Sequence, residues 1–164
     1  MSTYKKSSTA RWIIGAVSLL VVLLIGLGIH SQNTASKKTN REVALTCTTD
    51  MATKFHIHPH LEIIINNQKQ ETPANIGIAY TCMNALHTHD TSGIIHVESP
   101  EIRDFILADF FAVWNKPFNK DQILDYKVDA QHTIRVTVNG SEVQDFENTV
   151  LRDKDQIVIN YESI

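Results

Sequence analysis

Six of the chain's eight histidines fall in two short segments, at spacings that suit a metal site. The first segment, Phe55–Ile65, reads FHIHPHLEIII and places three histidines at two-residue intervals. Side chains at alternate positions of a strand project from one face, with neighbours about 6–7 Å apart, so adjacent rings can converge on one ion. The second segment, Leu86–Ser99, reads LHTHDTSGIIHVES and repeats this spacing before a further histidine. We therefore predict metal ligands at His56, His58, His60, His87, His89 and His96.

Carboxylates beside these histidines could complete or support the site. Asp90 follows His89 directly, and Glu98 lies two residues after His96. A carboxylate can bind the ion itself, or it can orient a ligating imidazole by accepting the ring's other N–H. Six histidines exceed the needs of one tetrahedral ion, so we expect two ions, or one ion with some rings further out. Imidazole suits both copper and zinc, and the tight binding of Cu(II) slightly favours copper.

Two other interpretations of the histidines stay open from the sequence. They could be polar residues on solvated strand faces, although Lys, Thr, Glu or Gln would serve that purpose equally well. They could also form a proton-responsive cluster without metal, since packed imidazoles lower one another's pKa. The chain has no H-E-x-x-H sequence, and its HTHD segment lacks the further histidine of an H-x-H-x-D-H motif. No familiar metallohydrolase motif therefore assigns an activity.

The two cysteines, Cys47 and Cys82, are an even number in a domain that we expect to face an oxidising space. We favour a disulfide between them, which would close a loop of about 36 residues and stabilise the fold by about 3–4 kcal/mol. One alternative makes Cys82 a thiolate metal ligand close to His87, and the other leaves two unrelated buried thiols.

The N-terminal segment Trp12–Ile29 is an apolar run without a charge. Its length is close to the ~20 residues with which a helix crosses the hydrocarbon core, so we expect a transmembrane anchor in contact with lipid. Basic residues precede the run, which suits a cytoplasmic tail over residues 1–11, although other basic residues follow it closely. The alternative is a cleaved signal peptide, which would make the protein secreted. Either way, we expect the rest of the chain to be extracytoplasmic.

Composition predicts one ordinary domain after the anchor. Residues 30–41 are polar and lack apolar periodicity, so we expect a tether, followed by a single histidine-rich domain over residues 42–164. With 43% apolar and 20% charged residues, the chain can bury one core. A net charge of −3 and the absence of a basic run exclude nucleic acid as an expected partner.

Strands are expected where the histidines lie. Phe55–Ile65 and Gly93–Ser99 alternate between apolar and polar residues, as half-buried strands do. Pro59 cannot donate a hydrogen bond to a neighbouring strand, which points to an edge strand or a bulge. Asn66-Asn67 predicts a turn into a short return strand around Gln68–Thr72.

One main helix is expected in the second half of the domain. Apolar residues recur at helical spacing from Ile102 to Trp114, and Ser99-Pro100 supplies a cap and a first-turn proline. The aromatic stripe of this helix should face the core. Asn119, with Gln122 three residues later, predicts a brief helical turn.

The C-terminal part predicts a hairpin and a last strand. TIRVTV and SEV flank Asn139-Gly140, a strong hairpin signal, and QIVINY follows a turn at Asp153–Asp155. The order of elements predicts an α+β domain with a mostly antiparallel or mixed sheet and one main amphipathic helix, for which the β-grasp is a candidate arrangement. One N-terminal transmembrane helix would precede it.

Four blocks of the sequence carry a resemblance. HIHPHLEIIIN, TPANIGI, C-x4-HTHDTSGIIHVES and DFFAVWNKPFN resemble a largely uncharacterised family of small archaeal and bacterial proteins that are often membrane-anchored or secreted. The resemblance covers Cys47–Ile164 and is most specific in the HTHDTSGIIHVES block. It implies that the histidine segments and Cys82 belong to one site or framework, and it implies no particular activity.

These observations predict a membrane-anchored, extracytoplasmic protein that binds copper or zinc, either to buffer or deliver metal or as a subunit of a membrane-protein complex. One alternative is a zinc-dependent hydrolase or hydratase in which Asp90 or Glu98 acts as general base toward a metal-bound water. Another is a structural accessory subunit without metal that presents Phe110, Phe111 and Trp114 to a partner.

Overall fold

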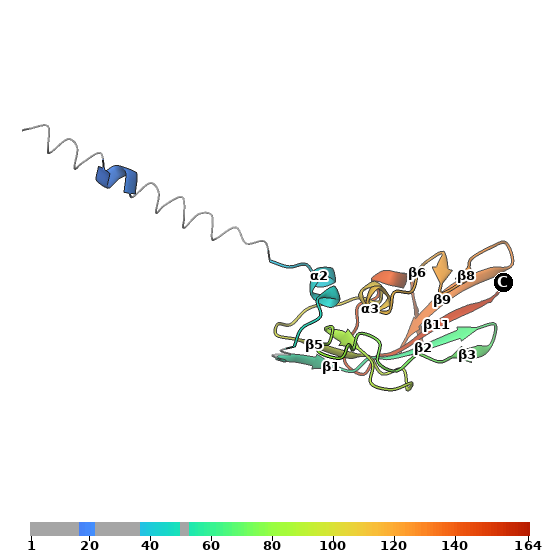
Figure 1. Ribbon diagram of the computed structural model, residues 1–164. Helices are drawn as coiled ribbons and strands as arrows, with labels where there is room; N and C mark the ends of the chain where they lie inside the picture. The colour runs from blue at the N-terminus through green and yellow to red at the C-terminus, as the bar shows by residue number, and fades with distance from the viewer. Residues whose placement is uncertain (1–16, 22–36, 50–52) are drawn as a thin grey trace, which may run out of the picture. The chain divides into compact units, whose positions relative to one another are not determined.

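The computed structural model describes residues 17–21, 37–49 and 53–164. The chain divides into two compact units, residues 1–37 and residues 38–164 (Figure 1). In the first unit, residues 17–21 are helical and exposed. The predicted tail, most of the predicted span Trp12–Ile29 and residues 30–36 of the predicted tether lie outside the described residues. Within the ranges described, no helix combines the length and the apolar character that crossing a membrane requires.

The second unit is an α+β domain with mostly antiparallel or mixed sheets, as the sequence predicts. It opens with helix α2, Asn40–Leu45, so the last two residues of the predicted tether are helical. A capping box starts this helix: the Thr39 hydroxyl accepts the N–H of Glu42, and the Glu42 carboxylate accepts the N–H of Thr39. The β-grasp arrangement stays a prediction.

The largest sheet has five strands in the order β10-β9-β11-β2-β3. It is mixed, because β11 runs parallel to β2 and antiparallel to β9. Both predicted hairpin turns are confirmed: Asn66 and Asn67 join β2 to β3, Asn139 and Gly140 join β9 to β10, and all four residues have positive φ. The strands are β2 (His60–Ile65), β3 (Gln68–Gln70), β9 (His132–Val138), β10 (Ser141–Val143) and β11 (Gln156–Ser163).

A three-stranded antiparallel sheet carries three of the histidines, His56, His87 and His96. Its order is β1-β5-β4, with β1 at Phe55–Ile57, β4 at Leu86–His87 and β5 at His96–Ser99. The predicted single strand Phe55–Ile65 is therefore two strands in two sheets, β1 and β2, which are visible in Figure 1. The chain changes sheet at Pro59, where the missing N–H interrupts strand pairing.

The predicted helical turn at Asn119 is wrong. Residues 118–127 form a small antiparallel sheet of β6 (Phe118–Asn119), β7 (Gln122–Ile123) and β8 (Tyr126–Lys127). The Asn119 side-chain oxygen accepts the N–H of Asp121 at 2.8 Å, which closes a hairpin turn. An asparagine can cap a helix or close such a turn with the same side-chain oxygen, so the local pattern did not distinguish them.

The main helix, α3, spans Leu107–Trp114, so its predicted start at Ser99-Pro100 is wrong. Extended backbone pairing occupies the preceding residues: the Leu107 N–H donates to Thr149 O, and the Leu151 N–H donates to Phe105 O, both at 2.9 Å. These hydrogen bonds exclude helical geometry there. Ile102, predicted on the apolar stripe, is 82% exposed.

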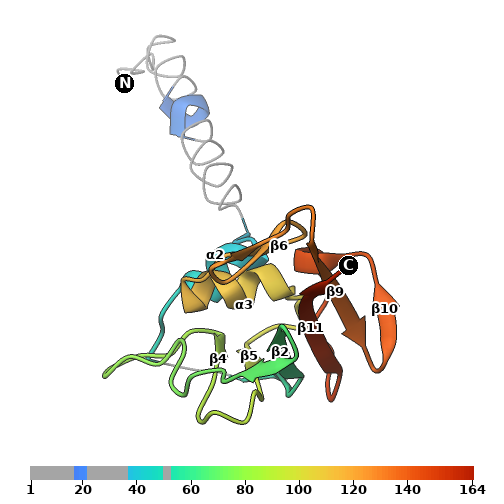
Figure 2. The ribbon, with the colours of Figure 1, turned by 90° about the vertical axis from the view of Figure 1, so that its right-hand side faces the viewer.

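Phe110 and Phe111 of α3 are buried, which confirms that the aromatic stripe belongs to the core. They are therefore not available to a partner, contrary to the accessory-subunit hypothesis. Helices α2 and α3 lie on one side of β2, β4 and β5 (Figure 2). Asp109, also buried, ties the two helices together because its carboxylate accepts the Ile106 N–H and pairs with Arg41 at 2.8 Å. A 3-10 turn, η1, spans Phe146–Asn148.

Candidate metal centre

Cys47 and Cys82 form a disulfide, which confirms the favoured prediction and excludes Cys82 as a thiolate ligand. The disulfide lies just before β4 and joins two segments that also share backbone hydrogen bonds. Thr48 and Met83 exchange two of these, at 2.9 and 3.0 Å. The Asn84 side chain donates to Ala44 O at 2.9 Å. These contacts position the residues that lead into His87.

Five of the six predicted histidines gather over the β1-β5-β4 sheet. His87 and His96 are cross-strand partners, and His56 lies opposite Glu98. Their nitrogens form two groups that could hold a metal ion, and in each group the ligand atoms lie within 4.8 Å of one another. We call His56, His58 and His96 the first triad, and His87, His89 and His96 the second triad.

In the first triad, one pair of nitrogens already has the spacing of metal ligands. His56 Nε2 lies 3.4 Å from His96 Nδ1. Ligands held at about 2.0–2.1 Å from a tetrahedral ion are about 3.4 Å apart. Glu98 Oε1 lies 3.1 Å from the same His56 nitrogen, so this predicted supporting carboxylate is within reach of the same ion. Asp153 Oδ1 lies 3.8 Å from His58 Nδ1 and could orient that ring.

In the second triad, His87 has one nitrogen fixed and one without a partner. His87 is fully buried, and its Nδ1 lies 3.1 Å from Asn84 O. A carbonyl can only accept, so Nδ1 carries the proton and Nε2 carries the lone pair. Among the described residues, Nε2 has no hydrogen-bond partner although it is buried. A ligating histidine typically donates its other N–H to a carbonyl in this way, so the arrangement suits metal binding through Nε2.

The environment favours neutral, ligating imidazoles. Burial lowers the pKa of His96 to about 4, and the neighbouring His89, His58, His87 and His56 reinforce the effect. Burial likewise lowers the pKa of His87, against the opposing effect of its hydrogen bond to Asn84 O. Both rings are therefore neutral at neutral pH, which is the state that binds a metal ion.

Acidification is expected to destabilise the metal-free protein through His96. The unfolded-state pKa of 6.5 exceeds the folded-state pKa of about 4, so the unfolded chain binds more protons between these values. The stabilising contribution is thus complete above about pH 6.5 and is lost as the pH falls toward 4. One pKa unit corresponds to 1.36 kcal/mol, and solvent screens a partly exposed ring, so we expect a loss of about 2–3 kcal/mol.

Urea unfolding with a chelator present, at about pH 7 and at about pH 4.5, measures this loss. His96→Gln should flatten the pH dependence, whereas His132→Gln, which lies outside both triads, should retain it. If the unfolding free energy of His96→Gln fell as steeply with pH as that of the wild type, the loss could not be assigned to His96.

His60 and Asp90 are not brought into either triad. The His60 Nε2 hydrogen-bonds to Ser92 O at 2.9 Å, and Asp90 accepts the N–H of Ser92 at 2.9 Å. Both residues therefore hold the loop between β4 and β5, which carries His89. The equal spacing of His56, His58 and His60 in sequence does not give equal roles, because the chain changes sheet between His58 and His60.

Gly93 allows this loop to approach β2. Its φ is +90°, its carbonyl accepts the Leu61 N–H at 2.8 Å, and an added Cβ would overlap the Leu61 carbonyl oxygen. Gly93→Ala is therefore expected to lower the unfolding free energy by about 3 kcal/mol. Gly140→Ala is the matched control: its φ is +81° with nothing within 4 Å of the added Cβ, so only about 1 kcal/mol should be lost. Urea unfolding measures both variants, and equal losses of unfolding free energy would show that the added Cβ at Gly93 does not clash with Leu61.

Sequence reasoning missed two contributors to the site. Nothing in the sequence links Asp153 to the site, because it lies 95 residues from His58. In the folded chain its carboxylate accepts the N–H of His58 at 3.0 Å. The Asn84 carbonyl is a backbone group, and any residue type could supply it. Only the folded chain brings either group to the histidines.

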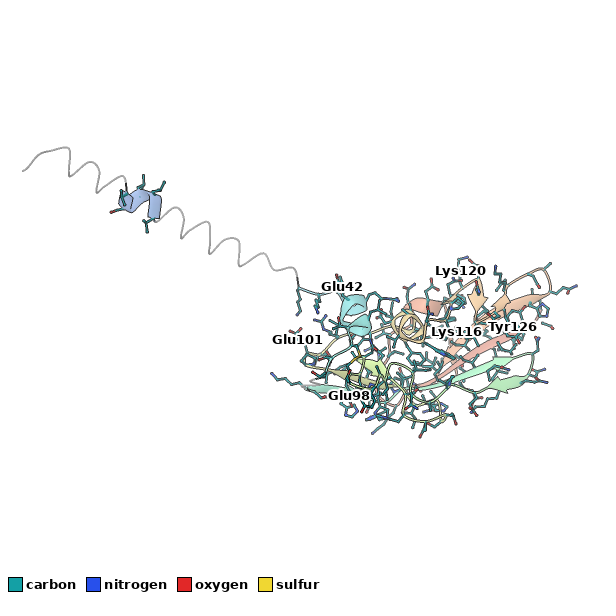
Figure 3. The ribbon with its side chains drawn as sticks, in the orientation of Figure 1. Glu42, Glu98, Glu101, Lys116, Lys120 and Tyr126 are labelled. Carbon is teal, nitrogen blue, oxygen red and sulfur yellow. A yellow bond between two sulfur atoms is a disulfide. The ribbon has the colours of Figure 1, made fainter. Side chains whose placement is uncertain are left out.

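The cluster lies at the surface. The His56 and His58 side chains are 42% and 41% exposed, and His89 is exposed, whereas His87 is buried beneath them. Figure 3 labels Glu98, which lies on the lower side of the domain in that view, away from Glu42 of α2. An ion in the second triad would have one buried ligand, His87. Solvent or another molecule can reach the exposed ligands of both triads.

No family model, curated protein or solved structure matches this chain. The fold and the site together define an α+β domain with a disulfide and a histidine cluster that could hold metal.

Proposed function

We propose that this protein is a membrane-anchored, extracytoplasmic binding protein for copper or zinc that buffers the metal or delivers it to another protein. The observation that carries the proposal is the buried Nε2 of His87, which has no hydrogen-bond partner within the described part of the chain and whose ring is oriented by Asn84 O. Leaving a buried polar atom unpaired costs about 1–3 kcal/mol, and a bound cation would remove that cost.

The donor set supports Cu(II) or Zn(II) as the metal. The triads offer imidazole nitrogens with carboxylates nearby, and both cysteines are occupied in the disulfide. Soft thiolate ligands, which favour Cu(I), are thus absent from the chain. The exposure of His56, His58 and His89 supports a role in transfer, because a partner's ligands can approach the ion.

The location in our proposal rests on two features. A disulfide persists in an oxidising compartment, which supports an extracytoplasmic domain. The apolar segment Trp12–Ile29 supports anchoring to a membrane, where a membrane-protein complex could receive the metal.

Elemental analysis of the full chain, purified in detergent without metal-affinity chromatography, tests the proposal. We expect stoichiometric copper or zinc, reduced in a His87→Ala/His89→Ala double variant, which removes two ligands of the second triad, and fully retained in His132→Ala, which alters a histidine outside both triads. Absence of metal after incubation with both ions would contradict the proposal.

A zinc-dependent hydrolase is the second candidate, favoured by the position of Glu98 beside the first triad. Three protein ligands leave a coordination position for water, and Glu98 could act as its general base. Zinc-loaded protein should then hydrolyse a simple ester such as p-nitrophenyl acetate, and Glu98→Gln should abolish the reaction while retaining zinc. No turnover above that of free zinc would exclude this candidate for esters.

A further inference from the structure

His96 occupies the middle of the histidine cluster. Its ring centroid lies 5.7 and 4.7 Å from those of His56 and His58, and 5.4 and 4.5 Å from those of His87 and His89. Across the part of the chain that the structure describes, no ring contact joins His56 or His58 directly to His87 or His89. The two outer pairs of rings therefore meet only through His96.

The two triads each have a feature of their own that points to an ion. The first contains the 3.4 Å pair of His56 Nε2 and His96 Nδ1, already at ligand spacing. The second contains the buried, unpartnered Nε2 of His87. One ion near the first pair would leave the His87 nitrogen without a partner, and one ion at His87 would leave His56 and His96 joined only by the long hydrogen bond of 3.4 Å between their rings.

We propose that the cluster binds two divalent ions together, with His96 bound to one ion through Nδ1 and to the other through Nε2. This inference rests on the proposed metal-binding function and specifies how many ions bind and what links them. Five rings then supply six ligand nitrogens, three to each ion, because a single imidazole ring has two nitrogens. The first ion takes His56, His58 and His96, and the second takes His87, His89 and His96.

The second ion requires one proton to leave. Neutral His96 carries one N–H, so coordination through both nitrogens breaks that N–H bond and releases the proton to solvent. The ring becomes an imidazolate anion between two cations. Each cation lies closer to this anion than to the other cation, so the bridge offsets their mutual repulsion. Glu98 beside His56 and Asp153 beside His58 add negative charge at the first triad.

Copper titration of the full chain in detergent, followed by electron paramagnetic resonance, tests the bridge. The first equivalent of Cu(II) should give a full signal. The second should remove signal rather than double it, because an imidazolate couples two Cu(II) spins antiferromagnetically. That second step should also release the extra proton, which an unbuffered titration with a pH indicator measures. One equivalent each of Zn(II) and Cu(II) should restore an uncoupled copper signal.

Two variants separate the bridge from its alternatives. His89→Ala alters an exposed ring of the second triad only, and should bind one Cu(II) with a full signal. His96→Ala should lose the coupling altogether, and His132→Ala should behave as the wild type. One ion per wild-type chain, or two ions with twice the single-ion signal, would overturn the bridge and leave the metal-binding function standing. No bound copper at all would overturn both.

Discussion

His87→Leu is expected to weaken Cu(II) binding at the second triad at least ~100-fold, yet to change the unfolding free energy of the metal-free protein by less than about 1 kcal/mol. The substitution removes the proposed ligand nitrogen Nε2, which is buried and has no hydrogen-bond partner among the described residues. Removing that nitrogen stabilises the metal-free state. Losing the hydrogen bond from Nδ1 to Asn84 O destabilises it by a similar amount, and leucine fills much of the same volume. If His87 had only a structural role, its replacement would not lower the copper affinity while leaving the unfolding free energy nearly unchanged.

Competition with a chelator of known copper affinity measures the first quantity, and urea unfolding in excess chelator measures the second. His132→Leu is the matched control, since His132 lies outside both triads. Copper at 100 times the Kd of the second triad should add about 2.7 kcal/mol of stability to the wild type through that triad, and His87→Leu should lack this contribution. Unchanged copper affinity in His87→Leu would remove His87 from the site.

Replacing both Cys47 and Cys82 by serine is expected to lower the unfolding free energy by about 4 kcal/mol. The bridged residues are 35 apart in sequence, and the disulfide restricts the unfolded chain by that loop. Metal affinity should fall too, by roughly 10-fold, because the segment beside Cys82 presents the Asn84 carbonyl that orients His87.

Urea unfolding and copper competition, both under oxidising conditions, measure these two losses. A dithiol reductant should bring the wild type to the stability of the double-serine variant and should leave that variant unchanged. A loss of stability without any loss of copper affinity would show that the disulfide does not position His87.

Local pattern predicted the strands and tight turns well. The alternation of His56, His58 and His60 with apolar residues survives in the structure, because successive side chains of an extended chain point to opposite faces. Asn-Gly and Asn-Asn turns formed hairpins because these residues tolerate positive φ. The disulfide followed from the cysteine count and the expected compartment.

The two errors had different causes: pairing with distant residues decided the first, and an ambiguous local pattern led to the second. The helix that the sequence places from Ser99-Pro100 begins at Leu107, because Phe105 and Leu107 pair with residues 149–151. The expected helical turn at Asn119 is a hairpin, because its side chain closes an Asx turn.

The sequence by itself determined the chemistry available to this protein: a concentration of imidazoles in two short segments, carboxylates beside them, and cysteines in a number that permits one disulfide. The spacing of the residues also determined which face of its strand each side chain occupies, because the alternation of side chains along an extended chain is a local property. Only the tertiary structure decided that His96 lies between two pairs of histidines, that His60 lies outside both triads, and that His87 is buried with an unpartnered nitrogen. Those outcomes depend on how three separate strands and two loops pack, and residue spacing along one strand contains no information about its neighbours.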